Sequence, residues 1–116
     1  MMTVILCMVI LMVTVSMAFA GATEDLLSAA KSKYTTPQMI RTLIKSGANV
    51  NAQDYYGKTA LMFTAWDDAW RGNVPEETTA LLKAGADVYA KDNDGKTVLD
   101  YARTDEVKRL ILNSAQ

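Results

Sequence analysis

The feature that most constrains this chain is a fifteen-residue stretch that occurs twice. GANVNAQDYYGKTAL occupies residues 47–61 and GADVYAKDNDGKTVL occupies residues 85–99, and nine of the fifteen letters are identical in place. The two copies begin 38 residues apart in a chain of 116 residues. A unit that recurs at a spacing of about 20–50 residues is typical of a repeat protein, in which each unit packs only against its neighbours. We therefore expect stacked units that share one continuous core.

The letters that the two copies share have mechanical roles at helix ends. Gly47 and Gly85 follow apolar helical runs, LIKS and LLKA. A helix commonly ends at a glycine in the left-handed conformation, where a Cβ would clash. Thr59 and Thr97 stand where the next helix is expected to begin, and a threonine hydroxyl there accepts a hydrogen bond from an unpaired helical N–H. Each copy therefore joins the end of one helix to the start of another.

The middle of each copy predicts a tight turn. Asp54 and Asp92 precede turns that glycines close, and aspartate side chains readily accept hydrogen bonds from backbone amides in such turns. Leu61 and Leu99 then begin the buried face of the following helix. The expected helix pairs are 24–32 with 37–46, 59–70 with 75–84, and 97–103 with 105–113. The pairs Leu43/Ile44, Leu81/Leu82 and Leu110/Ile111 recur at the same place in each second helix, and they are expected to stack into one core in which Leu43, Leu81 and Leu110 line up.

At this level the chain resembles the ankyrin repeat family. The motifs GKTALMFTA at 57–65 and GKTVLDYA at 95–102 are similar to the family's G-x-T-P-L-H-x-A signature, and GANVNA at 47–52 and GADVYA at 85–90 are similar to its G-A-D-V-N-A signature. The resemblance covers essentially all of 22–116 and implies an all-α solenoid of about three repeats, 22–53, 54–91 and 92–116. Two departures stand out. The proline and histidine of T-P-L-H are absent from both copies, and the spacing of 38 exceeds the family's 33, with the extra residues expected around 68–72.

The amino-terminal segment has a different composition. Residues 1–23 contain no charged side chain, and the apolar run ends in Ala18-Phe19-Ala20. Small residues at these spacings are what signal peptidase accepts, so we predict a signal peptide at 1–20, cleavage after Ala20, and a periplasmic or secreted domain at 21–116. The run lacks a lysine or arginine before it and approaches the roughly 20 residues that span a bilayer. An uncleaved membrane anchor is the alternative.

Composition excludes most catalytic chemistry. The chain has no histidine, and its one cysteine, Cys7, lies in the predicted signal peptide. Zinc sites of the usual kind and Ser–His–Asp or Cys–His centres are therefore excluded. We predict no enzyme, no catalytic residue, no cofactor and no small-molecule substrate. The formal charge of −1 gives no basic face for nucleic acid.

Two apparent ligand motifs fail on spacing. A phosphate-binding loop needs a glycine five positions before the GKT glycine, where this chain has Ala52 and Ala90. A calcium loop that began at Asp92 would need glycine sixth and an acid twelfth, but Gly95 is fourth and Arg103 is twelfth. The adjacent acids at 67–68 and 76–77 point about 100° apart on a helix, so neither pair converges on one atom.

The resemblance implies a protein-binding face built from hairpin tips and first helices. Adjacent tyrosines at a tip offer rigid contact area with little rotamer entropy to lose. Trp66 and Trp70 share one helical face, but Trp70 is more readily explained as packing, and Met62 and Phe63 are assigned to the core. We predict a monomeric, non-catalytic module that binds a protein partner, with an inhibitor or immunity role as a sharper form and an accessory subunit as another. The candidate contacts are Tyr55, Tyr56, Lys58, Trp66, Asp67, Asn93, Asp94 and Lys96.

Overall fold

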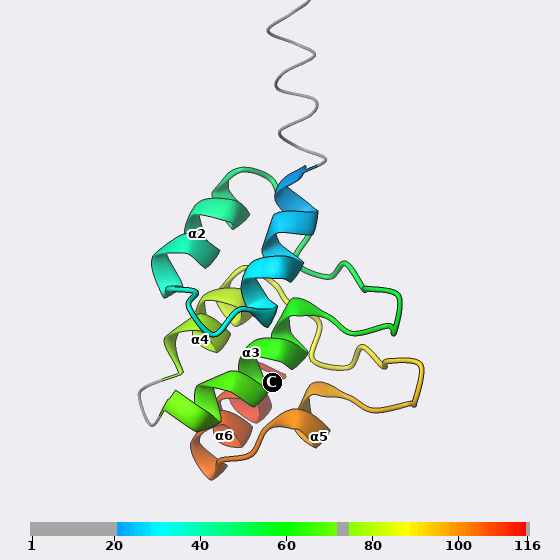
Figure 1. Ribbon diagram of the computed structural model, residues 1–116. Helices are drawn as coiled ribbons and strands as arrows, with labels where there is room; N and C mark the ends of the chain where they lie inside the picture. The colour runs from blue at the N-terminus through cyan, green and yellow to red at the C-terminus, as the bar shows by residue number, and fades with distance from the viewer. Residues whose placement is uncertain (1–20, 72–74, 116) are drawn as a thin grey trace, which may run out of the picture.

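The described part of the chain is an all-α stack of helix pairs. The computed structural model describes residues 21–71 and 75–115, without the side chains of 68–71. A first helix covers residues 21–31. It is followed by α2 (Pro37–Lys45), α3 (Ala60–Arg71), α4 (Glu76–Lys83), α5 (Val98–Tyr101) and α6 (Asp105–Ser114) (Figure 1). No strand forms within these ranges, so the predicted all-α repeat architecture is confirmed.

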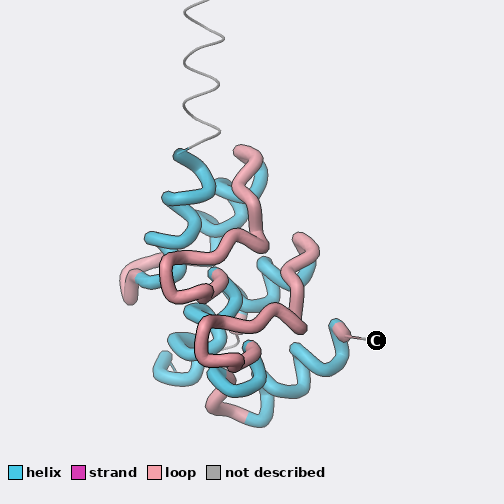
Figure 2. Tube along the Cα trace, turned by 90° about the vertical axis from the view of Figure 1, so that its right-hand side faces the viewer, coloured by secondary structure: helices cyan, strands magenta, loops and turns pink. Residues whose placement is uncertain are grey.

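The helices form two layers. One layer contains α2, α4 and α6, in which α2 packs on α4 and α4 packs on α6. The other contains the first helix, α3 and α5, and α3 contacts α5 along the stack and α4 across the layers. The two connecting loops that carry the repeated sequence project from the same side of the stack, one above the other (Figure 2). Equivalent positions of the two copies therefore lie side by side.

Hydrogen bonds between the two loops follow the sequence spacing. The Gln53 side-chain amide donates to the carbonyl oxygen of Lys91 at 3.0 Å, and that of Asn93 donates to the carbonyl oxygen of Tyr55 at 3.0 Å. Both bonds join residues 38 positions apart. The backbone N–H of Asn93 also donates to the Tyr56 carbonyl at 3.0 Å. The spacing of 38 is therefore the distance along the chain from one loop to its stacked neighbour.

Helix ends behave as their residues predict. Gly47 and Gly85 adopt φ values of 94° and 93°, the left-handed conformation expected after a helix. The hydroxyl of Thr36 accepts from the N–H of Met39 at 3.3 Å, and that of Thr59 accepts from the N–H of Met62 at 3.4 Å. These side chains satisfy amides that have no partner within the helix.

The second-layer core differs from the expectation at one residue. Leu81 of α4 is fully buried and Leu43 of α2 packs against the core from its edge, as predicted. Leu110 of α6 was expected to continue this row, but it is only partly buried, whereas its neighbour Ile111 is 1% exposed. That prediction was wrong, because α6 lies rotated about its axis so that Val107 and Ile111, four residues apart, face inward.

The last helix pair is also shorter than expected. The prediction of a helix over 97–103 was wrong, because α5 is a single turn that ends at Tyr101 and Ala102 is extended. The expectation that Leu99 is buried was wrong as well, since Leu99 is 36% exposed and Val98 occupies the core at 1%. No later repeat follows α5 within the described residues to cover Leu99.

Several expectations fall outside the described residues. They are the signal peptide or anchor at 1–20 with its cleavage site after Ala20, Cys7, residue 72 of the insertion expected around 68–72, and the side chains of Asp68 and Trp70. The part of the expected insertion that is described, 68–71, continues α3 as helix. None of the described helices is long and apolar enough to cross a membrane.

Candidate protein-binding surface

The tip of the first loop carries the most exposed aromatic side chains of the candidate surface. Tyr55 and Tyr56 are 89% and 64% exposed, and their rings meet edge to face with centroids 5.4 Å apart. Their carbonyl oxygens are the ones that accept hydrogen bonds from Asn93 of the next loop. Because the backbone is tied at both tyrosines, the tip presents two large side chains on a fixed support.

An aspartate holds each loop in the same way. Asp54 Oδ1 accepts from the backbone N–H groups of Tyr56 and Lys58, both at 2.9 Å. Asp92 Oδ1 accepts from the N–H groups of Asp94 at 3.0 Å and Lys96 at 2.9 Å. The predicted aspartate turns are therefore confirmed in both copies.

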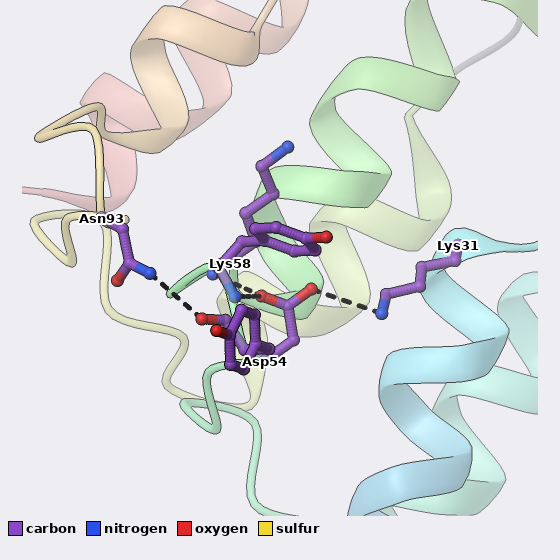
Figure 3. Close-up of polar contacts among 6 residues, drawn as sticks. Lys31, Asp54, Lys58 and Asn93 are labelled. Atoms are coloured by element: carbon purple, nitrogen blue, oxygen red, sulfur yellow. Dashed lines mark hydrogen bonds and ion pairs between the residues drawn. The ribbon is translucent and has the colours of Figure 1, made fainter.

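The second carboxylate oxygen of Asp54 ties the first loop to the first helix. Lys31 Nζ lies 3.3 Å from Asp54 Oδ2 (Figure 3). Burial alone would raise the pKa of the Asp54 carboxyl, but the N–H of Lys58, the Lys31 ammonium and the N–H of Tyr56 outweigh it and hold the pKa below its ordinary value. Asp54 is thus an ionised anchor for the loop.

The second oxygen of Asp92 has a different partner. The hydroxyl of Tyr101, on α5, donates a hydrogen bond to Asp92 Oδ2. This bond lowers the pKa of the Asp92 carboxyl and raises the pKa of Tyr101 to about 12. Both shifts have the same cause, since the bond favours a charged carboxylate and a neutral phenol. The second loop is therefore pinned to the end of the stack by a phenol, and the first loop by an ammonium.

An aromatic pocket lies next to the loops on the first-helix layer. It has a volume of about 240 Å³, and its walls come from α3, the first loop and α5. Trp66 stands at its edge, 44% exposed. We use the term aromatic pocket for the hollow lined by Lys58, Met62, Phe63, Trp66 and Tyr101.

Cations of the chain cover the rings of this pocket. Lys58 Nζ lies 5.5 Å from the ring centre of Tyr101 and 6.0 Å from that of Phe63. Lys31 Nζ lies 5.1 Å from the Phe63 ring, and the Arg103 guanidinium carbon lies 4.0 Å from the Trp66 ring. Each distance is within the range of an attractive cation–π contact. The surface beside the tyrosine tip is thus aromatic within and positive at its edge.

The candidate contacts occupy three settings. Tyr55, Tyr56, Lys58 and Trp66 gather on one side around the first loop and the aromatic pocket, and Asp94 and Lys96 are exposed on the second loop. Asn93 uses its amide groups to hold the neighbouring tip, and Asp67 is only partly exposed. Whether any of the eight contacts a partner stays a prediction.

Sequence reasoning missed four residues of this surface. Phe63 was assigned to the core together with Met62, but only Met62 is buried, and Phe63 packs against the core from the pocket. Adjacent residues of a helix point about 100° apart, and this rule predicts that the pair divides between core and surface. No sequence rule of this kind identifies the other three residues, because they reach the site only through the packing of one repeat on another. These residues are Lys31, Tyr101 and Arg103.

The comparison with protein families matches this geometry. Residues 26–55 match the family model described as Ankyrin repeat. The match spans most of the first helix, all of α2 and the first loop as far as its tyrosine tip. The chain therefore contains an ankyrin repeat at 26–55. The matched stretch is the first helix pair and loop, and the two stacked loops extend the same pattern to the next unit. No curated protein matches the chain.

Ankyrin-repeat domains are in general non-catalytic modules for protein–protein interaction, and this identity supports that role here. Solenoids of this kind present an extended surface along the stack, to which neighbouring repeats contribute side by side. The described part of this ankyrin-repeat protein gathers no three His, Cys, Asp or Glu side chains into a group suited to a metal ion.

Proposed function

We propose that this ankyrin-repeat protein is exported and binds one protein partner, in the periplasm or outside the cell, through the tip of its first loop and the adjacent face of α3. It acts as a monomer and catalyses nothing. Export is inferred from the apolar, uncharged segment that ends in Ala18-Phe19-Ala20.

The observation that carries the binding role is the fixed, exposed tyrosine pair. Two large side chains with exposed fractions of 89% and 64% stand on a loop whose backbone is hydrogen-bonded to the next loop. Tyrosine and tryptophan are enriched among the residues that dominate binding energy at interfaces. A preorganised support lowers the entropy that binding costs. Trp66, beside the pair, extends the same aromatic surface along α3.

The test is partner capture with a matched control. The full chain and a Tyr55→Ala/Tyr56→Ala/Trp66→Ala variant are used as baits against the envelope fraction of the native cells, with crosslinking. We expect the variant to lose the captured protein while its circular dichroism stays helical. Tyr34→Ala removes a tyrosine that is 80% exposed but lies in the turn before α2, and should leave capture unchanged. Capture that survives the triple change would place the interface elsewhere.

A sharper form of the proposal is an inhibitor or immunity protein that neutralises a secreted enzyme or toxin. A small, exported, rigid surface suits this role. Deleting the gene should then expose the cells to damage by a co-expressed exported effector. Cells that stay unharmed by every neighbouring effector would contradict this form without touching the binding role.

A second candidate is a membrane-tethered adaptor, and one observation favours it. The run before Ala20 has no lysine or arginine at its start and is nearly as long as a membrane span. Amino-terminal sequencing of the protein from cells separates the two candidates. A chain that begins at Gly21 supports the exported module, whereas a chain that begins at Met1 or Met2 supports the tethered adaptor.

A further inference from the structure

The aromatic pocket has room for one bulky apolar side chain. Its volume of about 240 Å³ exceeds the roughly 150 Å³ of an engineered apolar cavity that binds benzene. Its walls are an aliphatic thioether and three aromatic rings, and its position beside the tyrosine tip makes it continuous with the proposed binding surface. A side chain that entered the pocket would displace water and pack against the aromatic rings. Buried side chains of this kind contribute most of the binding energy at many interfaces.

The charge at its edge indicates what surrounds that side chain. A pocket of three aromatic rings would ordinarily suit a cation, such as a methylated lysine. Here the chain's own cations already lie over the rings, at 4.0 Å from Trp66 and 5.1 Å from Phe63. A second cation would meet like charges, and an anion would meet opposite ones. Because Lys31 already pairs with Asp54, the charge that favours a partner segment with carboxylates is that of Lys58, which lies over the rings of Phe63 and Tyr101.

Lys58 is the cation best placed to receive one. Its ammonium lies 6.0 Å from the ring centre of Phe63 and 5.5 Å from that of Tyr101, and among the described residues no carboxylate lies within ion-pair distance of it. The charge of Asp92 reaches Lys58 without forming an ion pair, and the two aspartates that hold the loops are already engaged. Asp54 pairs with Lys31 and Asp92 accepts the Tyr101 hydroxyl, and both also accept backbone amides.

We infer that the aromatic pocket binds an acidic segment of the partner, which inserts one aliphatic or aromatic side chain between the rings and places a carboxylate on Lys58. The inference rests on the proposed protein-binding role and specifies its chemistry. Electrostatic attraction brings the segment to the positive edge, and the apolar insertion holds it there.

The experiment uses a library of random peptides displayed on phage, selected against the purified full chain. We expect the enriched peptides to combine carboxylates with a bulky apolar residue and to bind less tightly as salt is added. Synthetic copies of these peptides are then measured by fluorescence anisotropy against two charge variants. Lys58→Glu should weaken binding by about tenfold or more, because it replaces attraction with repulsion at the pocket.

The chain supplies a matched control 38 residues further on. Lys96 has the same place in the second loop as Lys58 in the first, and its backbone N–H bonds to an aspartate in the same way, at 2.9 Å. Lys96 is a candidate contact for the whole partner but does not line the aromatic pocket, so for peptides that bind in the pocket Lys96→Glu should weaken binding by less than about threefold, through the long-range field alone. Trp66→Ala, which removes a pocket wall, should weaken binding as Lys58→Glu does.

Three results would overturn the inference. They are enrichment of cationic peptides, equal effects of the two lysine variants, and no enrichment above an unrelated protein. The envelope capture experiment reports separately on the proposed function. If the enriched peptides lack carboxylates and lose binding only to the Tyr55→Ala/Tyr56→Ala variant, the proposed protein-binding role is supported. The inference of an acidic ligand in the aromatic pocket is then wrong.

Discussion

The stacking of the two loops leads to a prediction about a pair of equivalent glycines. Gly57 and Gly95 hold the same place in the two copies and have nearly the same backbone conformation, with φ values of 77° and 76°. A Cβ at Gly57 would lie 2.7 Å from Asn93 Oδ1, 2.9 Å from Asn93 N and 3.0 Å from Asp92 Cα. A Cβ at Gly95 would meet nothing within 4 Å. Substitution by alanine therefore imposes the same backbone strain at both sites, and a collision with the next loop at only one.

The two costs are separable in magnitude. The left-handed conformation costs a residue with a Cβ about 1–2 kcal/mol, and this is the whole expected loss for Gly95→Ala. Gly57→Ala adds an overpacking cost of about 1–3 kcal/mol. It also displaces Asn93, whose two bonds to the first loop contribute about 0.5–1.5 kcal/mol each. We therefore expect Gly57→Ala to lose about 2–6 kcal/mol more than Gly95→Ala.

Urea denaturation followed by circular dichroism measures this difference. With a urea dependence of about 1–2 kcal/mol per molar for a domain of this size, the midpoint of Gly57→Ala should fall below that of Gly95→Ala by about 1 M or more. If the Gly57→Ala protein is already unfolded in water while the Gly95→Ala protein stays folded, the prediction is confirmed as well. Losses equal within about 0.5 kcal/mol would refute the reasoning, because the two loops would then not be in contact.

Three further predictions concern titration and packing. The pKa values of the Asp54 and Asp92 carboxyls are lowered in the folded chain, so the stability that these carboxylates give the fold is complete above the unfolded pKa of about 3.9 and is lost as the pH falls through the folded pKa values. Thermal melts at decreasing pH should show this loss, and Asp54→Asn should make the melting temperature less dependent on pH. Tyr101, with a pKa of about 12, should ionise well above the ordinary phenol value of about 10 in an ultraviolet titration, and the stabilisation that its hydrogen bond gives should persist to about pH 10 and disappear as the pH rises through the folded value. A Tyr101→Phe variant that still shows a phenol ionising near pH 12 would contradict this. Ile111→Ala should lower the free energy of unfolding by about 2–5 kcal/mol, measured by urea denaturation, and Leu110→Ala should lower it clearly less. The reverse order would contradict the assignment of Ile111, rather than Leu110, to the core.

Local chemistry explains which features were predictable from the sequence. Thr59, Gly47 and Asp54 each act through bonds or dihedral angles within a few residues of themselves, and each lies as predicted. Leu99 and Leu110 do not lie as predicted. The burial of Leu99 depends on what covers it from another repeat, and that of Leu110 depends on how its helix is rotated against its neighbour. The repeated motif identifies the start of α5 but carries no information on how far this helix extends.

The candidate surface also has one part that the sequence predicts and one part that it does not. The tyrosine tip was predictable because two exposed aromatic residues follow a turn-forming aspartate. The aromatic pocket was not, because it joins side chains from α3, the first loop and α5. Only the stacking of successive units brings Lys58 and Tyr101 together.

Site-specific photocrosslinking in the native cells tests the central claim most directly. Benzoylphenylalanine is placed at Tyr56, on the tip of the first loop, and in a second strain at Lys108, an exposed residue of α6 in the other layer. We expect irradiation to join the chain covalently to one protein from position 56 and to none from position 108. Crosslinks to the same protein from position 108 alone, or equally from both positions, would contradict a binding surface built on the stacked loops and α3.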